Sequence, residues 1–236
     1  MLKIKLISLL LPIKIVAIIF NPDPVRNEWI KNITEHIPKT DIISKSLRNR
    51  GRPGGVNFIV SQGDILISEV LFNPRPGGVD FVEIYNNSGH DIDLKELKIA
   101  NISKTGKIAN IKSVSTKKLI MAAGTYWVIT TNQNDIKLNY TVRFPNQFTQ
   151  IKTMPAYNND KGTVILLSNN QLLDRLDYNA KIHHPLIQDE DGISLERVSF
   201  NIPSNDPGNF KSTAATAGFA TPTDRNSQSL IDGNNE

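Results

Sequence analysis

Three features of the sequence predict an all-β domain. Short apolar segments recur at regular intervals from Asp64 onward, and clusters of Asn, Asp and Gly separate them. In one segment, Asp80–Asn86, polar side chains are interspersed with bulky ones, which we interpret as the alternation of a strand. A period of two is typical of a strand with one buried face, while Asn, Asp and Gly tolerate the positive φ of tight turns. Short strands at this spacing favour a sandwich or a barrel.

The expected strands follow one another along the chain. The first two are Ile65–Leu71 and Asp80–Asn86, which are joined through an Asn-Pro and Pro-Gly-Gly turn. The other expected strands are Asp91–Leu94, Leu97–Ile102, Ile108–Val114, Lys118–Ala122, Tyr126–Thr131, Thr149–Thr153, Thr163–Ser168, Leu172–Asn179 and Ile193–Val198. Asn134–Tyr140 is the one segment among them that we expect to form a short helical turn.

Bulk composition excludes some classes of protein. The chain has 236 residues, of which 39% are hydrophobic and 21% are charged, as in a soluble globular protein. Its net charge of +4 is too small to indicate a nucleic-acid-binding surface. The absence of cysteine excludes disulfides, thiol catalysis and cysteine-based zinc sites.

The first 63 residues have a different character from the rest. In residues 1–20, Lys3 and Lys5 precede an apolar run, as in an export signal or membrane anchor, but Pro12 and Lys14 interrupt it. A truncated or misplaced start is therefore the other interpretation. We interpret residues 21–63 as a linker or degenerate extension, irregular or partly helical, in which RPGGVNFIV echoes the later RPGGVDFVE. Residues 64–227 form the expected β-sandwich, and residues 228–236 a disordered tail.

Five segments in order resemble one family. They are ILISEVLFNPRPGGVDFVEIYNNS, HDIDLKELKIAN, AAGTYWVITTN, DKGTVILLSNNQLLDRLDYN and a closing segment that contains AGFATPTDRNSQ. Together they resemble the lamin tail domain family, in the version carried by exported or cell-surface proteins of Bacteroidetes-type bacteria. The resemblance implies an immunoglobulin-like β-sandwich, often found beside other sandwich domains or hydrolases.

Three acids near the first turn invite a chemical interpretation. Glu69, Asp80 and Glu83 are of a type that can bind a cation or act as acid and base. Acids at alternate positions are also ordinary on a half-exposed sheet. We favour the second interpretation and expect these side chains to point outward from two paired edge strands.

The weak metal candidates are Asp189, Asp191 and His183. The two aspartates lie in an acidic loop that lacks the spacing of a twelve-residue calcium loop, so a solvated loop is the favoured interpretation. His183 and His184 are adjacent, and neighbouring residues on a strand point to opposite faces. No Gly-x-Ser-x-Gly segment suggests a catalytic serine. The sequence therefore predicts no catalytic residue, no cofactor and no enzyme activity.

Lys112, Lys117 and Lys118 form a small basic cluster with Tyr126 and Trp127 nearby. Lysines on an edge strand that discourage edge pairing are the favoured interpretation, and Trp127 is expected in the core. The predicted function is a non-catalytic structural or interaction module of a secreted or cell-surface protein. The alternative is an accessory domain that binds polysaccharide or nucleic acid beside a secreted hydrolase or nuclease. The expected partner is a protein or surface component, with membrane contact only through the N-terminal segment.

Overall fold

A computed structural model describes residues 59–229 of the chain. The expectations for residues 1–58, namely the export signal, the extension and its repeat echo, lie outside the described residues, as does the tail from residue 230. The strands are β1 (Ile65–Leu71), β2 (Phe81–Asn86), β3 (Ile92–Asp93), β4 (Leu97–Ile102), β5 (Ile108–Ser113), β6 (Ile120–Met121), β7 (Tyr126–Thr130), β8 (Phe148–Gln150), β9 (Lys161–Ser168), β10 (Gln171–Asn179), β11 (Leu195–Arg197) and β12 (Phe210–Ser212). The helices are α3 (Gln133–Asn139) and the 3-10 turns η1 (Leu94–Glu96), η2 (Ala180–Ile182) and η3 (Ala215–Ala217).

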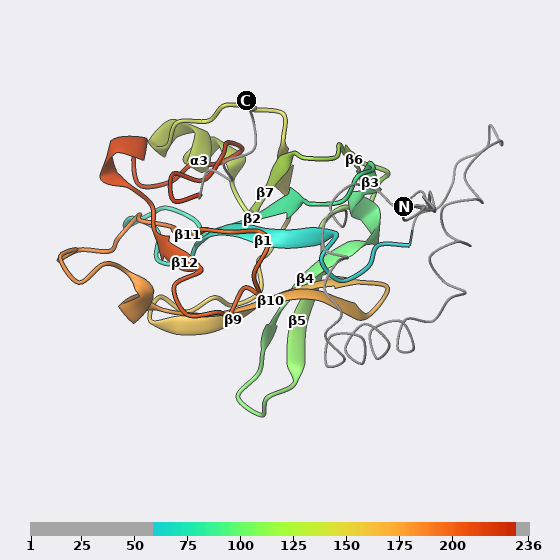
Figure 1. Ribbon diagram of the computed structural model, residues 1–236, viewed down its shortest axis with the longest axis horizontal. Coiled ribbons are helices and arrows are strands. Elements are labelled where there is room, and N and C mark those ends of the chain that lie inside the picture. The colour runs from blue at the N-terminus through green and yellow to red at the C-terminus, as the bar shows by residue number, and fades with distance from the viewer. Residues whose placement is uncertain (1–58, 230–236) are drawn as a thin grey trace, which may run out of the picture. The chain divides into compact units, whose positions relative to one another are not determined.

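Two largely antiparallel sheets face each other as an immunoglobulin-like β-sandwich (Figure 1), and β3 and β6 form a separate two-stranded sheet. The larger sheet has the strand order β12-β11-β1-β2-β7-β8, and the smaller has the order β10-β9-β4-β5. Only β7 and β8 pair in parallel among the described strands. Apolar side chains from both sheets fill the space between them, including Ile67, Ile84, Ile99 and Leu166. The predicted fold class is therefore confirmed for this part of the chain.

The hairpin of β1 and β2 occupies the middle of the larger sheet. Its turn uses Gly77 at φ +82°, a conformation that glycine adopts without steric cost, and the Gly78 N–H donates to the Arg75 carbonyl at 2.7 Å. The pairing register shifts between Ile67 and Glu69, which places a bulge in β1. Every residue of β1 is buried, because both faces of this central strand are covered.

A buried ion pair joins the two sheets at one end of the core. Arg197 on β11 donates from Nη2 to Asp174 Oδ2 on β10 at 2.7 Å. Arg197 also donates from Nε to the Ile67 carbonyl at 2.6 Å, and the Ile67 N–H donates to Asp174 Oδ2 at 2.9 Å. The bulged part of β1 is thus held by both members of the pair.

The other face of the larger sheet is covered as well. Leu71, Phe81 and Val128 pack there against Ile136 of α3 and against Ala220. Helix α3 begins after Asn132, whose side chain accepts from the N–H groups of Asn134 and Asp135. The C-terminal part of the chain, residues 213–229, lies across the rest of this face and is called the closing segment below.

The strand expectations agree closely with the structure. The bounds of β1 and β4 are those predicted, and the predicted helical turn is α3, one residue earlier. The strand β12 was not expected, because it lies in a segment rich in Pro, Ser and Asn. Trp127 lies in the core as predicted, with its exposed fraction at 7%.

Candidate functional site

Three glutamates form a row across the middle of the larger sheet. Glu69 on β1 pairs in register with Glu196 on β11 and with Glu83 on β2. The exposed fraction of all three is 0%. The expectation that Glu69 and Glu83 point into solvent from edge strands is therefore wrong: β1 and β2 are interior strands, and the closing segment covers this face.

The closing segment supplies most hydrogen bonds to the glutamate row. The Thr221 N–H donates to Glu69 Oε1 at 3.0 Å, and the Thr221 hydroxyl donates to Glu196 Oε1 at 2.5 Å. The Thr223 N–H donates to Glu83 Oε2 at 2.5 Å. Glu196 Oε2 accepts from the Ser227 hydroxyl at 2.6 Å and from the Gln228 N–H at 3.0 Å. Each glutamate thus receives at least one donor from this segment.

Asn226 holds the same segment to the bulge of β1. Its Nδ2 donates to the carbonyls of Ser68 at 3.1 Å and Arg197 at 2.9 Å, while its Oδ1 accepts from the Ser68 hydroxyl at 3.1 Å. The Asn in the sequence AGFATPTDRNSQ therefore satisfies backbone groups that the bulge leaves free of the strand ladder.

Burial and mutual repulsion change the ionisation of the row. Burial, followed by the charge of Glu196, raises the pKa of Glu69 to about 8. Burial, followed by the charge of Glu69, raises the pKa of Glu83 well above its ordinary value. Asp80 lies just before β2, and burial raises its pKa to about 7. Raised carboxyl pKa values occur at catalytic sites, but they also follow from burial alone. With every glutamate bonded to the protein and closed to solvent, the row has no room for a substrate.

The weak metal candidates occupy separate hydrogen-bonded positions. Asp191 Oδ1 accepts from Asn73 Nδ2 at 2.8 Å, and Asp189 Oδ1 accepts from the Asp191 N–H at 3.0 Å. His183 is buried against the Phe72 ring, with 5.7 Å between ring centroids. Within residues 59–229 no group of three or more His, Asp or Glu side chains has the geometry to hold a metal ion.

His183 does form a pair with a hydroxyl. Its Nδ1 lies 3.0 Å from Ser212 Oγ, and both residues line a cavity of about 620 Å³. The pair lacks the rest of a catalytic set: His183 Nε2 is buried with no hydrogen-bond partner in the described residues, so no third group orients the imidazole. Burial also lowers the pKa of His183 to about 4. Ser212 Oγ instead accepts from the His184 N–H at 2.9 Å and fixes the turn there.

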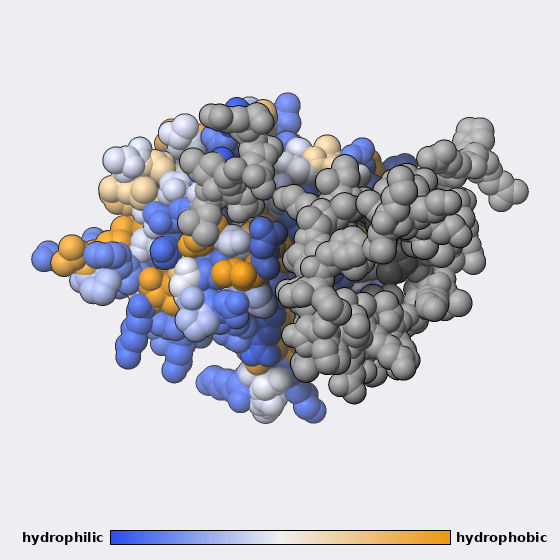
Figure 2. All heavy atoms as spheres, viewed as in Figure 1, coloured by the Kyte–Doolittle hydropathy of each residue, from blue (hydrophilic) through white to orange (hydrophobic). Residues whose placement is uncertain are grey.

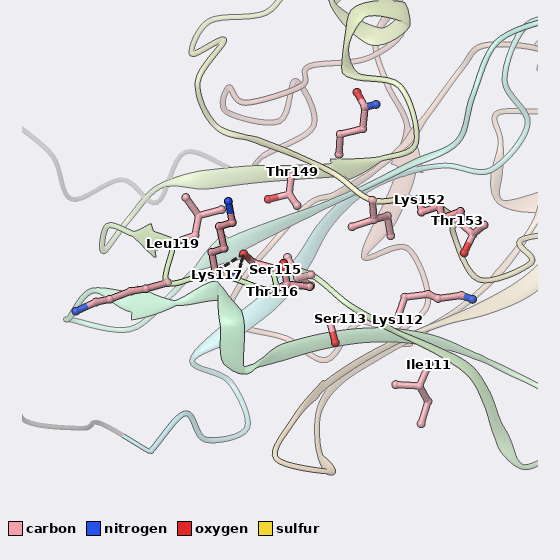
Figure 3. A pocket seen from close by; sticks show the side chains of 14 residues that line it. Ile111, Lys112, Ser113, Ser115, Thr116, Lys117, Leu119, Thr149, Lys152 and Thr153 are labelled. Atoms are coloured by element: carbon pink, nitrogen blue, oxygen red, sulfur yellow. Dashed lines mark hydrogen bonds between the residues drawn. The ribbon is translucent and has the colours of Figure 1, made fainter.

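An open groove lies where the edge strands of the two sheets meet. It has a volume of about 600 Å³ and runs between β5 with the following loop on one side and β8 with the following residues on the other (Figure 3). Four of its lining residues are lysines and five are serines or threonines, and none is acidic: Lys112, Lys117, Lys118, Lys152, Ser113, Ser115, Thr116, Thr149 and Thr153. The groove therefore presents four positive charges toward a space that solvent and ligands can enter, against two lysines, Lys181 and Lys211, in the cavity beside His183.

Sequence reasoning found part of this groove and missed the rest. Lys112, Lys117 and Lys118 were grouped as a basic cluster, and the structure brings them together as expected. It adds Lys152 and Thr149 from β8 and the residues after it, which no local pattern connects to β5. The aromatic neighbours are not part of the lining: Trp127 is buried, and its Nε1 donates to Thr149 Oγ1 at 2.9 Å.

No helix in residues 59–229 is long and apolar enough to cross a membrane. The comparison with curated proteins found no match. Among solved structures, a DUF4876 family protein from Bacteroides thetaiotaomicron is similar, with 12% identity, 74% of each chain covered and a TM-score of 0.38. The lamin tail domain family matches residues 60–180, which span β1 to β10 and so take in most strands of both sheets. On that match, the chain belongs to the lamin tail domain family.

Proposed function

We propose that this chain is a non-catalytic interaction module of an exported or cell-surface bacterial protein, which contacts its partner through sheet edges and loops at the groove between β5 and β8. The observation that carries this proposal is the groove itself: it is open, and four lysines line it without any acid. A protein surface with one sign of charge attracts a partner of the other sign.

Two features of the described residues favour binding over catalysis. The titratable groups with the largest shifts in pKa are buried, and donors from the closing segment hold the glutamates among them. The one serine–histidine pair lacks an orienting third group. A catalytic site needs a complete set of groups that converge on a position a substrate can occupy. The glutamate row has no such position, and the serine–histidine pair lines a cavity but is not a complete set.

Export of the protein is supported by residues 1–20, where two lysines precede an apolar run. Fractionation of the bacterium that carries the gene, with an antibody against the full chain, tests this part of the proposal. We expect the protein in the envelope or the medium; recovery in the cytoplasm alone would overturn it.

Hydrogen exchange tests the binding surface. The full chain is measured alone and with an envelope fraction from the same bacterium. We expect slower exchange at the amides of β5 and the loop at residues 114–119, and unchanged exchange in β10, the opposite edge of the same sheet. Protection confined to other regions, or hydrolysis of ester, phosphodiester or glycosidic substrates, would contradict the proposal.

A further inference from the structure

Positive charge is concentrated in one stretch of the chain. Between Glu96 and Asp160 there are eight lysines and one arginine but a single acid, Asp135, so this stretch has a net charge of +8, against +4 for the whole chain. The stretch includes β4 to β8, and therefore both sides of the groove. The tip of the β4–β5 hairpin adds two exposed lysines, Lys104 and Lys107. Hydrophilic residues cover much of the described surface in Figure 2, with apolar residues between them.

The lysines of the groove are available to a ligand. Lys117, Lys118 and Lys152 are exposed, and Lys112 is half-buried. None of the four has a salt bridge among the described residues. Asp93 lies near the loop, but its Oδ1 already accepts from the N–H groups of Lys95 at 3.1 Å and Leu119 at 2.9 Å. The groove thus holds positive charge that no acid of residues 59–229 neutralises through a salt bridge.

The edge strand itself is poorly suited to a peptide that adds as a further strand. β5 contains a bulge at Asn110, which has φ +52°, and Asn110 Nδ2 donates to Asn101 Oδ1 at 3.0 Å. Bulges and lysines on an edge strand oppose pairing with another strand. The groove therefore favours a ligand that binds through its charges and polar groups rather than through its backbone.

The other lining residues distinguish among anionic polymers. No aromatic residue lines the groove, so it has no platform on which nucleic-acid bases stack. Thr149 Oγ1 and Ser115 Oγ are already bonded to Trp127 and Lys117, while the hydroxyls of the other three, Ser113, Thr116 and Thr153, can both donate and accept hydrogen bonds. Phosphate oxygens only accept, whereas the hydroxyls of a sugar chain also donate. A polymer with both anionic groups and free hydroxyls matches the whole lining.

We infer that the groove between β5 and β8 binds an acidic polysaccharide, with Lys112, Lys117, Lys118 and Lys152 on its carboxylates or sulfates and Ser113, Thr116 and Thr153 on its hydroxyls. This assignment rests on the proposed function and names the ligand class for it. In Figure 3, Lys112 and Ser113 come from β5 and Lys152 from the opposite side of the groove, so a chain lying along it meets both sheets.

Binding of the full chain to immobilised polygalacturonate tests the inference, with neutral dextran and duplex DNA as comparison surfaces. The groove variant carries Lys112, Lys117, Lys118 and Lys152→Gln. The control variant, with the same change in net charge, carries Lys95, Lys161, Lys181 and Lys211→Gln, which alters exposed lysines outside the groove. We expect the groove variant to lose at least about tenfold in affinity and to show a weaker dependence on salt, while the control variant changes by less than about threefold.

A second variant tests the hydroxyls without changing the charge. Thr116→Val and Thr153→Val remove two exposed hydroxyls from the lining. We expect weaker binding to polygalacturonate and unchanged binding to DNA. Equal losses in the two lysine variants would show general charge attraction, and tighter binding to DNA than to polygalacturonate would assign the groove to nucleic acid; either result overturns the inference.

Absence of polygalacturonate binding would also overturn it. In that case hydrogen exchange with the envelope fraction separates the two proposals. Protection of β5 and the loop at residues 114–119 would leave the interaction module standing with a different ligand, while protection nowhere in the described residues would remove both.

Discussion

The glutamate row and the lysine groove are both sets of like charges, but the protein treats them in opposite ways. Glu69, Glu83 and Glu196 lie beneath the closing segment, where the chain's own hydroxyls and N–H groups bind them. The groove lysines lie at an open side of the sandwich and bind no acid among the described residues. The first set is part of how the fold is closed, and the second is the set that we propose binds a ligand.

Because of this contrast, substitutions in the two sets should have different effects on the free energy of unfolding. A buried ionisable group affects the free energy of unfolding because water cannot replace a partner that is removed. An exposed charge contributes little to stability and acts instead on association. Substitutions at buried charges should therefore change stability, and substitutions in the groove should change binding alone.

Removing a buried charge is the most severe test of the contrast. Arg197→Met leaves Asp174 buried without its cation and leaves the Ile67 carbonyl without its donor. We expect the free energy of unfolding to fall by about 3–5 kcal/mol, measured by urea denaturation. The control is Arg175→Met, which breaks an exposed pair with Asp177 and should cost less than about 1 kcal/mol. Similar losses in the free energy of unfolding for both variants would contradict the claim that a buried ion pair contributes more to stability than an exposed one.

The second largest effect is expected from the ionisation of Glu69, which makes the stability of the protein depend on pH. Because the pKa of Glu69 is raised to about 8 in the folded protein, the folded state holds a proton that the unfolded chain has already lost at neutral pH. Stability is therefore greatest at low pH and falls as the pH rises through about 8, where the folded carboxyl ionises. We expect a loss of about 2–4 kcal/mol between pH 5 and pH 8.

Glu69→Gln checks the origin of this loss. A neutral amide can still accept from the Thr221 N–H but does not ionise, so the variant should be more stable than the parent protein at pH 8, with a flatter profile. A parent protein whose stability increases from pH 5 to pH 8 would contradict the raised pKa.

A smaller effect is expected from loosening the closing segment. Asn226→Ala removes one acceptor and two donor contacts and leaves the carbonyls of Ser68 and Arg197 buried without them. We expect a cost of about 1–3 kcal/mol and faster amide exchange in residues 213–229. The matched substitution Asn205→Ala alters an exposed asparagine bonded to Asp177 and should leave exchange in the closing segment unchanged.

The smallest effect on stability is expected in the groove. The variant with Lys112, Lys117, Lys118 and Lys152→Gln should unfold within about 0.5 kcal/mol of the parent protein, because most of these side chains are exposed and none is in a salt bridge of the described residues. Thermal denaturation measures this. A loss of several kcal/mol would show that the lysines stabilise the sandwich and are not reserved for a ligand.

Local patterns in the sequence predicted every strand except β12 and an all-β fold, while the choice of an immunoglobulin-like sandwich came from the resemblance to the lamin tail domain family. The alternation in Asp80–Asn86 predicted β2 to within one residue, and the apolar run Ile65–Leu71 is β1. Glu83 does lie on the face of β2 opposite Ile84, which packs in the core, but the sequence pattern could not show that other residues cover that face. The cover comes from Thr221 and Thr223, whose partners lie 152 and 140 residues earlier in the chain.

Only one side of the groove could be predicted from the sequence, because its other side comes from a distant part of the chain. Lys117 and Lys118 are neighbours in the sequence, and Lys112 is on the strand before them, so a basic cluster is visible without a structure. Lys152 joins them only because β8, an edge of one sheet, comes close to β5, an edge of the other. Pairing across two sheets depends on the complete topology, and a periodic pattern does not contain that information.

The position of the closing segment has a consequence for biosynthesis. The strands β1 and β2 leave the ribosome early, with Glu69 and Glu83 already side by side in their hairpin. The residues that cover them are among the last described residues to be made. Until then the nascent chain lacks the donors that bind these carboxylates in the folded protein. The cover of the glutamate row is therefore completed only after the C-terminal part of the chain has been made.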